Sequence, residues 1–369
     1  MYRWDEFLKS NKSKVVVLRV PHGEIGGVQR TVKKAMEMAS WNDHIVGENV
    51  AIKVNLISNQ LVPGQCTSPW VLEGVIQQVL EGIPNARLTI CDSDLAAAEQ
   101  CDEAFEIWGH KQIAETYGAR FVNLSKESGV KIDVPNSLIF REIEVPKTIM
   151  NADCIITVPV LKTHVLSTIT CALKHQWGIV NRTVRHQYHL VFDKAIADIN
   201  TVLKNKLKFA VVDGTIGMEA NGPRTGHPVV CNLIIASPDM VACDAVAVAL
   251  MGIPLEKVKH IQICARHGIG SLEYELVSDL DNLKPVHSFA LPDKKWAPIF
   301  FWELFFRQSF LNKLVFNTEI FKFVSWIATQ YNSILWFRLR GNRYAQEIFN
   351  DPYYGLEFRR LANEETDRK

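Results

Sequence analysis

The segment from Lys162 to His189 contains an unusual concentration of basic and imidazole side chains. Eight of them fall within 28 positions, and no carboxylate lies among them: Lys162, His164, Lys174, His175, Arg182, Arg185, His186 and His189. A cluster of one sign makes a positive pocket, lowers the pKa of a neighbouring lysine or histidine and attracts anions. We therefore predict the active region here. The alternative is a basic face that is open to solvent.

Two residues at the start of this segment are the first candidates for catalysis. The apolar run from 155 to 161 is typical of a buried strand, and polar residues follow it directly. If the chain stays extended there, Lys162 and His164 share a side, so a cation and a titratable imidazole can reach one small molecule. Lys174 joins them from a segment with helical spacing. A surface loop is the alternative interpretation.

A second lysine–amide pair stands in the run from Val50 to Leu56. Strand alternation places Ala51, Lys53 and Asn55 on the face opposite to the larger apolar residues. A lysine can bind a carboxylate or phosphate oxygen as a point charge, and an asparagine can act as an oriented donor. The pair therefore predicts an anion contact near a strand end. The alternative is a lysine that extends to solvent at the sheet edge.

Two carboxylates and two histidines complete the predicted site. Asp213 and Glu219 lie at or just beyond the end of a predicted strand, where they can accept a proton or hold a hard cation. His186 and His189 would share a helical face, and two such imidazoles can ligate one divalent metal. The cofactor is unknown, with nickel, iron or zinc as candidates. The eight cysteines form no C-x-x-C, so the chain has no iron–sulfur cluster motif.

These residues receive three predicted roles. Catalysis is expected from Lys162, His164, Lys174, Asp213 and Glu219. Substrate binding is expected from Lys53, Asn55, Thr163, His175, Arg182, Arg185, Gly222 and Gly226. Metal binding is expected from His186 and His189.

Strand-like and helix-like segments alternate along the chain, and their order predicts the fold that positions the site. The predicted strands are 14–20, 50–56, 87–92, 120–124, 154–160, 209–213 and 232–237. The predicted helices are 29–38, 69–81, 102–117, 190–203 and 239–251. This alternation predicts an α/β fold, with a mostly parallel sheet covered by helices and divided into two sub-domains. Ligands of such sheets bind at the carboxyl ends of the strands.

Composition and charge limit the kinds of partner. The chain has 369 residues and a formal charge of +1, which gives no reason to expect a nucleic-acid partner. Scattered cysteines and the absence of a visible secretory signal predict a cytoplasmic protein. Residues 1–292 are predicted to form the α/β domain and 293–369 an appended helical module rich in aromatic residues. Its segment 296–337 suits a homodimer contact, a lid or a peripheral position at the inner membrane face.

Six short motifs stand in order within residues 45–270: Lys53-x-Asn55-Leu56, Pro159-x-Leu161-Lys162-Thr163-His164, Ala172-Leu173-Lys174-x-x-x-Gly178, Asp213-Gly214, Met218-Glu219-x-x-Gly222-Pro223-x-x-Gly226, and Ser237-x-Asp239 with Asp244. This order resembles the domain of unknown function family 362. Many members of that family carry a ferredoxin domain, which implies redox chemistry for them, and this chain lacks the matching cysteines. It also has His175 where relatives usually have Asn, and Ala220 where they usually have Gly. The family is distantly similar in fold to the nickel-pincer lactate racemase type.

The predicted function is an enzyme of the oxidoreductase or isomerase kind. It would act on a small anionic, oxygenated substrate by proton or hydride transfer in a pocket rich in lysine and histidine, with or without a metal. The alternative is a non-catalytic accessory protein that handles a cofactor or cluster and docks on a membrane or partner through its C-terminal module.

Overall fold

The computed structural model describes residues 12–21, 24, 26–95, 98–181, 185–280, 283–293, 305, 323, 327, 330–359 and 361, apart from the side chains of residues 186, 332 and 333. The strands are β1 (Ser13–Arg19), β2 (Asn49–Lys53), β3 (Arg87–Asp92), β4 (Arg120–Asn123), β5 (Gly129–Asp133), β6 (Glu142–Pro146), β7 (Cys154–Thr157), β8 (Val160–His164), β9 (Thr168–Thr170), β10 (Leu207–Glu219), β11 (His227–Ser237) and β12 (Tyr274–Ser278). The helices of the α/β part are α2 (Gly27–Met38), α3 (Pro69–Gly82), α4 (Cys101–Ile107), α5 (His110–Tyr117), α6 (Lys147–Asn151), α7 (Ala172–His175), α9 (Phe192–Leu203), α10 (Met240–Leu250) and α11 (Lys259–Arg266).

The main sheet has the order β12-β1-β11-β10-β7-β2-β3-β4 within the described residues. Strands β7, β2, β3 and β4 run parallel to one another, and β11 is antiparallel to both of its neighbours. The long strand β10 pairs with β7 through its first half and with β8 further on. Because β2, β3 and β7 end side by side, Lys53, Asp92 and Thr157 come to the same edge of the sheet.

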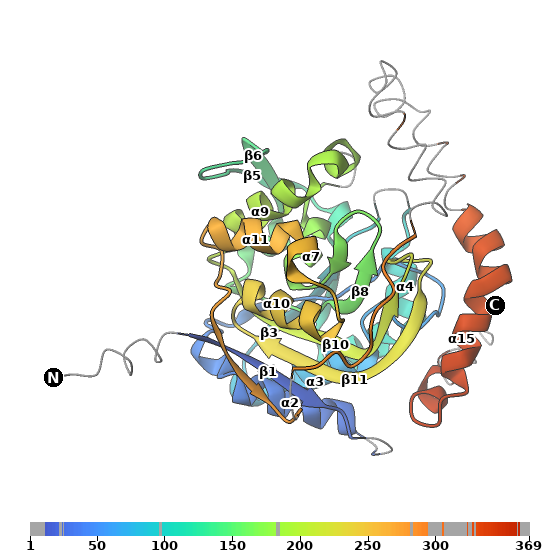
Figure 1. Cartoon of the computed structure of the whole chain (residues 1–369). Helices are drawn as coiled ribbons and strands as arrows, with labels where there is room; N and C mark the ends of the chain where they lie inside the picture. The colour runs from blue at the N-terminus through green and yellow to red at the C-terminus, as the bar shows by residue number, and fades with distance from the viewer. Residues whose placement is uncertain are drawn as a thin grey trace.

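Helices cover both faces of this sheet, as a mostly parallel sheet requires. In Figure 1, α2 and α3 lie on the side opposite to α7, α10 and α11. Successive side chains of β2 point to opposite faces of the sheet. Val50 and Ile52 belong to the apolar cluster on one face, and Ala51 belongs to the cluster on the other. The predicted α/β class and the predicted division of the faces of β2 are confirmed.

The structure divides two segments that the sequence predicts as continuous. The expected strand 154–160 is interrupted at Val158 and Pro159, because proline has no N–H to donate to a ladder. The expected helix 102–117 is split at Gly109, which adopts a left-handed conformation with φ of +75°. Strands β5 and β6 form a separate two-stranded hairpin that the sequence analysis did not predict.

The described part of the C-terminal segment packs against the α/β domain. Helix α15 (Asn342–Phe349) follows a π-helical stretch (Tyr331–Gly341), and Figure 1 shows α15 on the side away from the β5–β6 hairpin. Tyr354 and Phe358 are buried in the same apolar cluster as Trp70, and the Tyr354 hydroxyl donates to Asn232 Oδ1 at 2.8 Å. Most of the segment 296–337, and with it the predicted surface contact, lies outside the described residues. No helix in the described part is both long enough and apolar enough to cross a membrane.

Candidate active site

A buried ion pair forms the floor of the candidate site. Lys53, at the end of β2, is 1% exposed, and its Nζ lies 2.7 Å from Asp92 Oδ1 at the end of β3. The second oxygen of Asp92 accepts a hydrogen bond from the Leu56 N–H at 2.6 Å. Lys53 therefore does not reach solvent at a sheet edge, and its charge is matched by a carboxylate. Its role in substrate binding stays a prediction.

Lys162 brings a second fully buried ammonium group beside this pair. Its Nζ donates to the Asn55 side-chain oxygen and to the Gln65 carbonyl, the latter at 2.7 Å. Both acceptors are neutral. Burial lowers the pKa of Lys162 to about 8, and the nearby Asp92 and Asp213 oppose that shift. The predicted neighbourhood of Lys53, Asn55 and Lys162 is thus present in the structure.

Lys174 differs from the two other lysines of the cluster. It is only part-buried, and among the described residues its Nζ has no hydrogen-bond or ion-pair partner. The contact that it makes is with the ring of Phe192, whose centroid lies 5.7 Å from Nζ. Burial, and then the charges of Lys162, Arg185 and Lys53, lower the pKa of Lys174 to about 7. Lys174 is therefore an amine that a ligand can approach, held among other cations.

His164 presents one nitrogen to the site and uses the other to fix its own loop. Its Nδ1 accepts hydrogen bonds from the N–H groups of Leu166 and Ser167 at 3.1 and 3.3 Å. The proton of the neutral ring must then be on Nε2, which has no hydrogen-bond partner among the described residues. Burial, followed by the charge of Lys174, holds the pKa of His164 well below its usual value. His164 is accordingly suited to act as a neutral hydrogen-bond donor to an oxygen atom.

Phe192 is the apolar centre around which these groups gather. The ring of His164 stacks on it with a centroid distance of 6.0 Å, and Trp177 contacts it edge-on at 4.5 Å. His189 approaches the same ring at 5.8 Å, and its charge contributes to lowering the pKa of His164. Lys174, His164 and His189 therefore all lie against the ring of Phe192.

Helix α7 carries Lys174 and is anchored at both ends. Asp244, fully buried on α10, accepts hydrogen bonds from the N–H groups of Ala172 and Leu173 at 2.7 and 3.1 Å. His175 Nε2 donates to the Val54 carbonyl at 2.9 Å, and its Nδ1 accepts from the Thr157 hydroxyl at 2.6 Å. Both ring nitrogens of His175 are thus used within the protein. These contacts join α7, which carries Lys174, to the main sheet, and the role of His175 in substrate binding stays a prediction.

Arg185 connects the cluster to the loop that follows α7. Its guanidinium donates to the carbonyls of Val180, Asp94 and Gly178 and to the Ser93 hydroxyl, at 2.6 to 2.8 Å. Gly178 lies against the Lys53–Asp92 pair so closely that a β-carbon there would stand 3.0 Å from Lys53 Nζ. The glycine therefore allows the loop to pack onto the ion pair.

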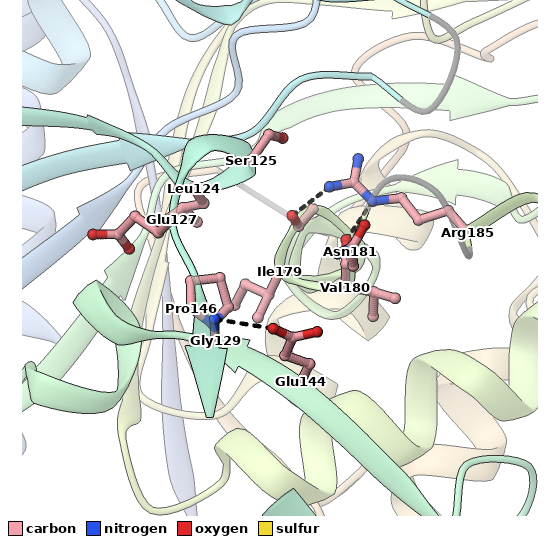
Figure 2. Close-up of a pocket in the computed structure, with 11 residues that line it drawn as sticks. Leu124, Ser125, Glu127, Gly129, Glu144, Pro146, Ile179, Val180, Asn181 and Arg185 are labelled. Atoms are coloured by element: carbon pink, nitrogen blue, oxygen red, sulfur yellow. Dashed lines mark hydrogen bonds between the residues drawn. The ribbon is translucent and has the colours of Figure 1, made fainter. Parts of the chain in front are cut away.

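A pocket opens on the far side of this loop (Figure 2). It lies between Gly178–Asn181 and the β5–β6 hairpin, and its cavity volume is about 30 Å³, enough for about one or two water molecules. Figure 2 shows Arg185 at one side and the Glu127 carboxylate directed away from it. Glu144, from β6, accepts a hydrogen bond from the Gly129 N–H at 3.1 Å. The hairpin thus supplies one wall of a space whose other wall is held by Arg185.

Other predicted residues make contacts elsewhere. Asp213 is fully buried and accepts from the N–H groups of Ser68 and Thr215 and from the Thr215 hydroxyl. Glu219 binds His287 Nε2 at 3.0 Å and the Ala290 N–H at 2.7 Å. Among the described side chains, neither carboxylate has a hydrogen bond to His164, His175 or His189. Their contacts instead hold loops that border the site.

The glycines of the predicted binding loop are required by close packing. A β-carbon at Gly222 would meet the Thr163 carbonyl oxygen at 2.1 Å, and one at Gly226 would meet the Glu219 carbonyl oxygen at 2.3 Å. Thr163 is buried, and its hydroxyl donates to the Ala220 carbonyl at 2.8 Å. These three residues join the loop after β10 to the end of β8. Their roles in substrate binding stay predictions.

The predicted metal pair lies only in part within the described residues. The side chain of His186 and all of Arg182 lie outside the described residues. In the part of the chain that is described, no three His, Cys, Asp or Glu side chains come close enough together to hold a metal ion. A metal at His186 and His189 stays a prediction, and the chemistry below does not use one.

Three residues of the site were not singled out by the sequence analysis, namely Asp92, Phe192 and Trp177. A signal existed for Asp92, since it closes a predicted strand at the carboxyl end, where ligands of parallel sheets bind. Phe192 and Trp177 had no such signal, because apolar residues at helical spacing usually belong to the core.

Comparisons with known proteins show to which family the chain belongs. Among solved structures, the chain is similar to the lactate racemase apoprotein from Thermoanaerobacterium thermosaccharolyticum, with 13% sequence identity and a TM-score of 0.41. That similarity covers 63% of this chain and 56% of the other, little more than half of its length. No curated protein matches the chain. A family model described as "Domain of unknown function (DUF362)" matches residues 50–249, which is more than half of the chain. This protein therefore belongs to the family DUF362.

Proposed function

We propose that this protein is an enzyme that binds a small oxygenated anion at Lys174 and His164 and promotes proton transfer on it. The observation that carries the proposal is the part-buried amine of Lys174, which has no partner among the described residues and stands beside other cations. Amines and imidazoles with strongly shifted pKa values in one cluster are typical of catalytic sites.

Each residue has a role that follows from its contacts. Lys174 binds the anionic group of the substrate while it is protonated, and the buried charge of Lys162 strengthens that attraction. His164 donates a hydrogen bond from Nε2 to a second substrate oxygen and stabilises negative charge that develops there. Phe192 excludes water from one side of the amine. Asp92, Asp244 and His175 act as positioning residues.

The role of His164 can be tested with a simple anion. We expect oxalate to bind the full chain, and His164→Ala to raise its dissociation constant by about tenfold, since one hydrogen bond to a charged group contributes about 1.5–3 kcal/mol. Isothermal titration calorimetry measures the constant, and a cooperative urea transition shows that the variant is folded. His267→Ala, at an exposed histidine after α11, is the matched control. Equal affinity of the two variants would contradict the role of His164.

A second proposal concerns the surface of the C-terminal segment. Ile334, Leu335 and Leu339 are 47%, 50% and 69% exposed, and the exposed Arg338 and Arg340 lie beside them. Exposed apolar side chains flanked by arginines favour docking on an anionic membrane surface. We expect Leu335→Lys combined with Leu339→Lys to lower cosedimentation with vesicles containing phosphatidylserine at least threefold. Neutral phosphatidylcholine vesicles are the control, and unchanged sedimentation of the variant would contradict this proposal.

A further inference from the structure

We propose that Lys174 is a nucleophile that forms an imine with the carbonyl carbon of a small oxoacid. This inference rests on the proposed function and names its substrate class: the protonated form of Lys174 attracts the anion, and the neutral form of the same amine attacks the carbonyl carbon. It begins with a difference among three lysines. Lys53 has Asp92 as partner and Lys162 has Asn55 and Gln65, whereas Lys174 Nζ has none among the described residues. Of the three amines, Lys174 Nζ is therefore the one that a ligand can reach without displacing a protein partner.

The environment of Lys174 favours a neutral amine. Three cations, Lys162, Arg185 and Lys53, act on it electrostatically, and Phe192 lies against it without supplying a negative charge. With a pKa of about 7, roughly half of the amine is unprotonated at neutral pH, whereas a free lysine is almost fully protonated. A lysine beside other cations or in an apolar pocket is one of the general ways to activate an amine nucleophile.

The backbone around Lys174 is fixed, which the reaction requires. Asp244 holds the first turn of α7, His175 joins its end to β2, and Asn200 donates to the Leu173 carbonyl at 3.0 Å. The residues on both sides of Lys174 are therefore held by hydrogen bonds. An amine on such a support approaches a bound carbonyl in a limited range of directions, which favours the attack.

The step balances with the groups at hand. The lone pair of the neutral amine forms the C–N bond, and the carbonyl oxygen receives the electron pair of the broken π bond. That oxygen leaves as water with the two amine hydrogens, so an amine and a carbonyl give an imine and water. His164 Nε2–H donates a hydrogen bond to the oxygen while it is negative and keeps its proton. The imine makes the neighbouring C–H bond more acidic, which connects this step with proton transfer.

The test is reductive trapping with glyoxylate, a small anionic aldehyde. The full chain is treated with glyoxylate and cyanoborohydride at neutral pH, which converts an imine to a carboxymethylated lysine that is located by peptide mass spectrometry. Lys111, an exposed lysine paired with Glu106, is the internal reference. We expect Lys174 to be modified at least about tenfold faster than Lys111, because far more of its amine is neutral. The preference should disappear at alkaline pH.

Two outcomes separate the imine from the anion site. Suppression of the Lys174 reaction by oxalate, which is an anion without an aldehyde, supports both. Modification of Lys174 no faster than Lys111 overturns the imine; the anion site survives that result if oxalate raises the melting temperature of the natural sequence but not that of Lys174→Met. If Lys174 reacts no faster than Lys111 and oxalate also leaves the melting temperature of the natural sequence unchanged, both proposals are overturned.

Discussion

Replacement of Asp92 by asparagine is expected to lower the free energy of unfolding by about 3 kcal/mol or more. The substitution leaves the shape of the side chain but removes the negative charge beside Lys53, whose side chain is 1% exposed. An ammonium that is buried without its partner loses hydration and gains nothing in return, and breaking a buried pair from one side costs about 3–5 kcal/mol. Urea denaturation followed by circular dichroism measures the change.

An exposed ion pair in the same chain provides the matched control for this experiment. Glu106→Gln breaks the pair with Lys111, in which both side chains are about half exposed, and should cost less than about 1 kcal/mol. Combining Asp92→Asn with Lys53→Met should recover part of the loss, because the double variant no longer buries a charge. If Asp92→Asn costs no more than Glu106→Gln, the ion pair does not organise the site.

The second large effect is the dependence of anion binding on pH. Lys174 and Lys162 have pKa values of about 7 and about 8. Above its pKa, each lysine loses its charge, and a site that needs the charged form weakens tenfold per pH unit. Between about pH 6 and about pH 9, the dissociation constant for oxalate should rise about 100-fold through Lys174 and a further ~10-fold through Lys162. Calorimetry at constant ionic strength measures it.

The stability of the protein should change in the opposite direction over the same range. In the unfolded chain, both lysines keep their protons to higher pH, so the unfolded state binds more protons than the folded state above about pH 7. The free energy of unfolding should therefore rise with pH while affinity falls, which excludes unfolding as the cause of weaker binding. In Lys174→Met the weakening that begins near pH 7 should be absent. An affinity that is constant with pH would contradict the role of both lysines.

The sequence predicted the parts of the site that depend on local pattern. Strand alternation placed Lys53 and Asn55 on one face, and the pattern predicted a polar strand end at Lys162. The contact between Lys162 and Asn55 is seen only in the structure. The contacts of His175 could not be predicted, because its two partners are distant in sequence. They are the Val54 carbonyl, just after β2, and the Thr157 hydroxyl at the end of β7. The absence of carboxylates from the segment 162–189 was likewise a property of the sequence segment and not of the folded site. Asp92 and Asp244 enter the cluster from β3 and α10.

The hairpin of β5 and β6 and the buried ion pair of the candidate site belong to two different sheets. It forms its own two-stranded sheet and supplies Gly129, Glu144 and Pro146 to the pocket in Figure 2, whereas the ion pair of Lys53 and Asp92 belongs to the main sheet. Mutations in the hairpin can therefore change the size and polarity of that wall without burying or exposing a charge in the cluster. Substitutions at Gly129, Glu144 and Pro146 therefore alter this pocket while they leave the buried ion pair of the main sheet in place.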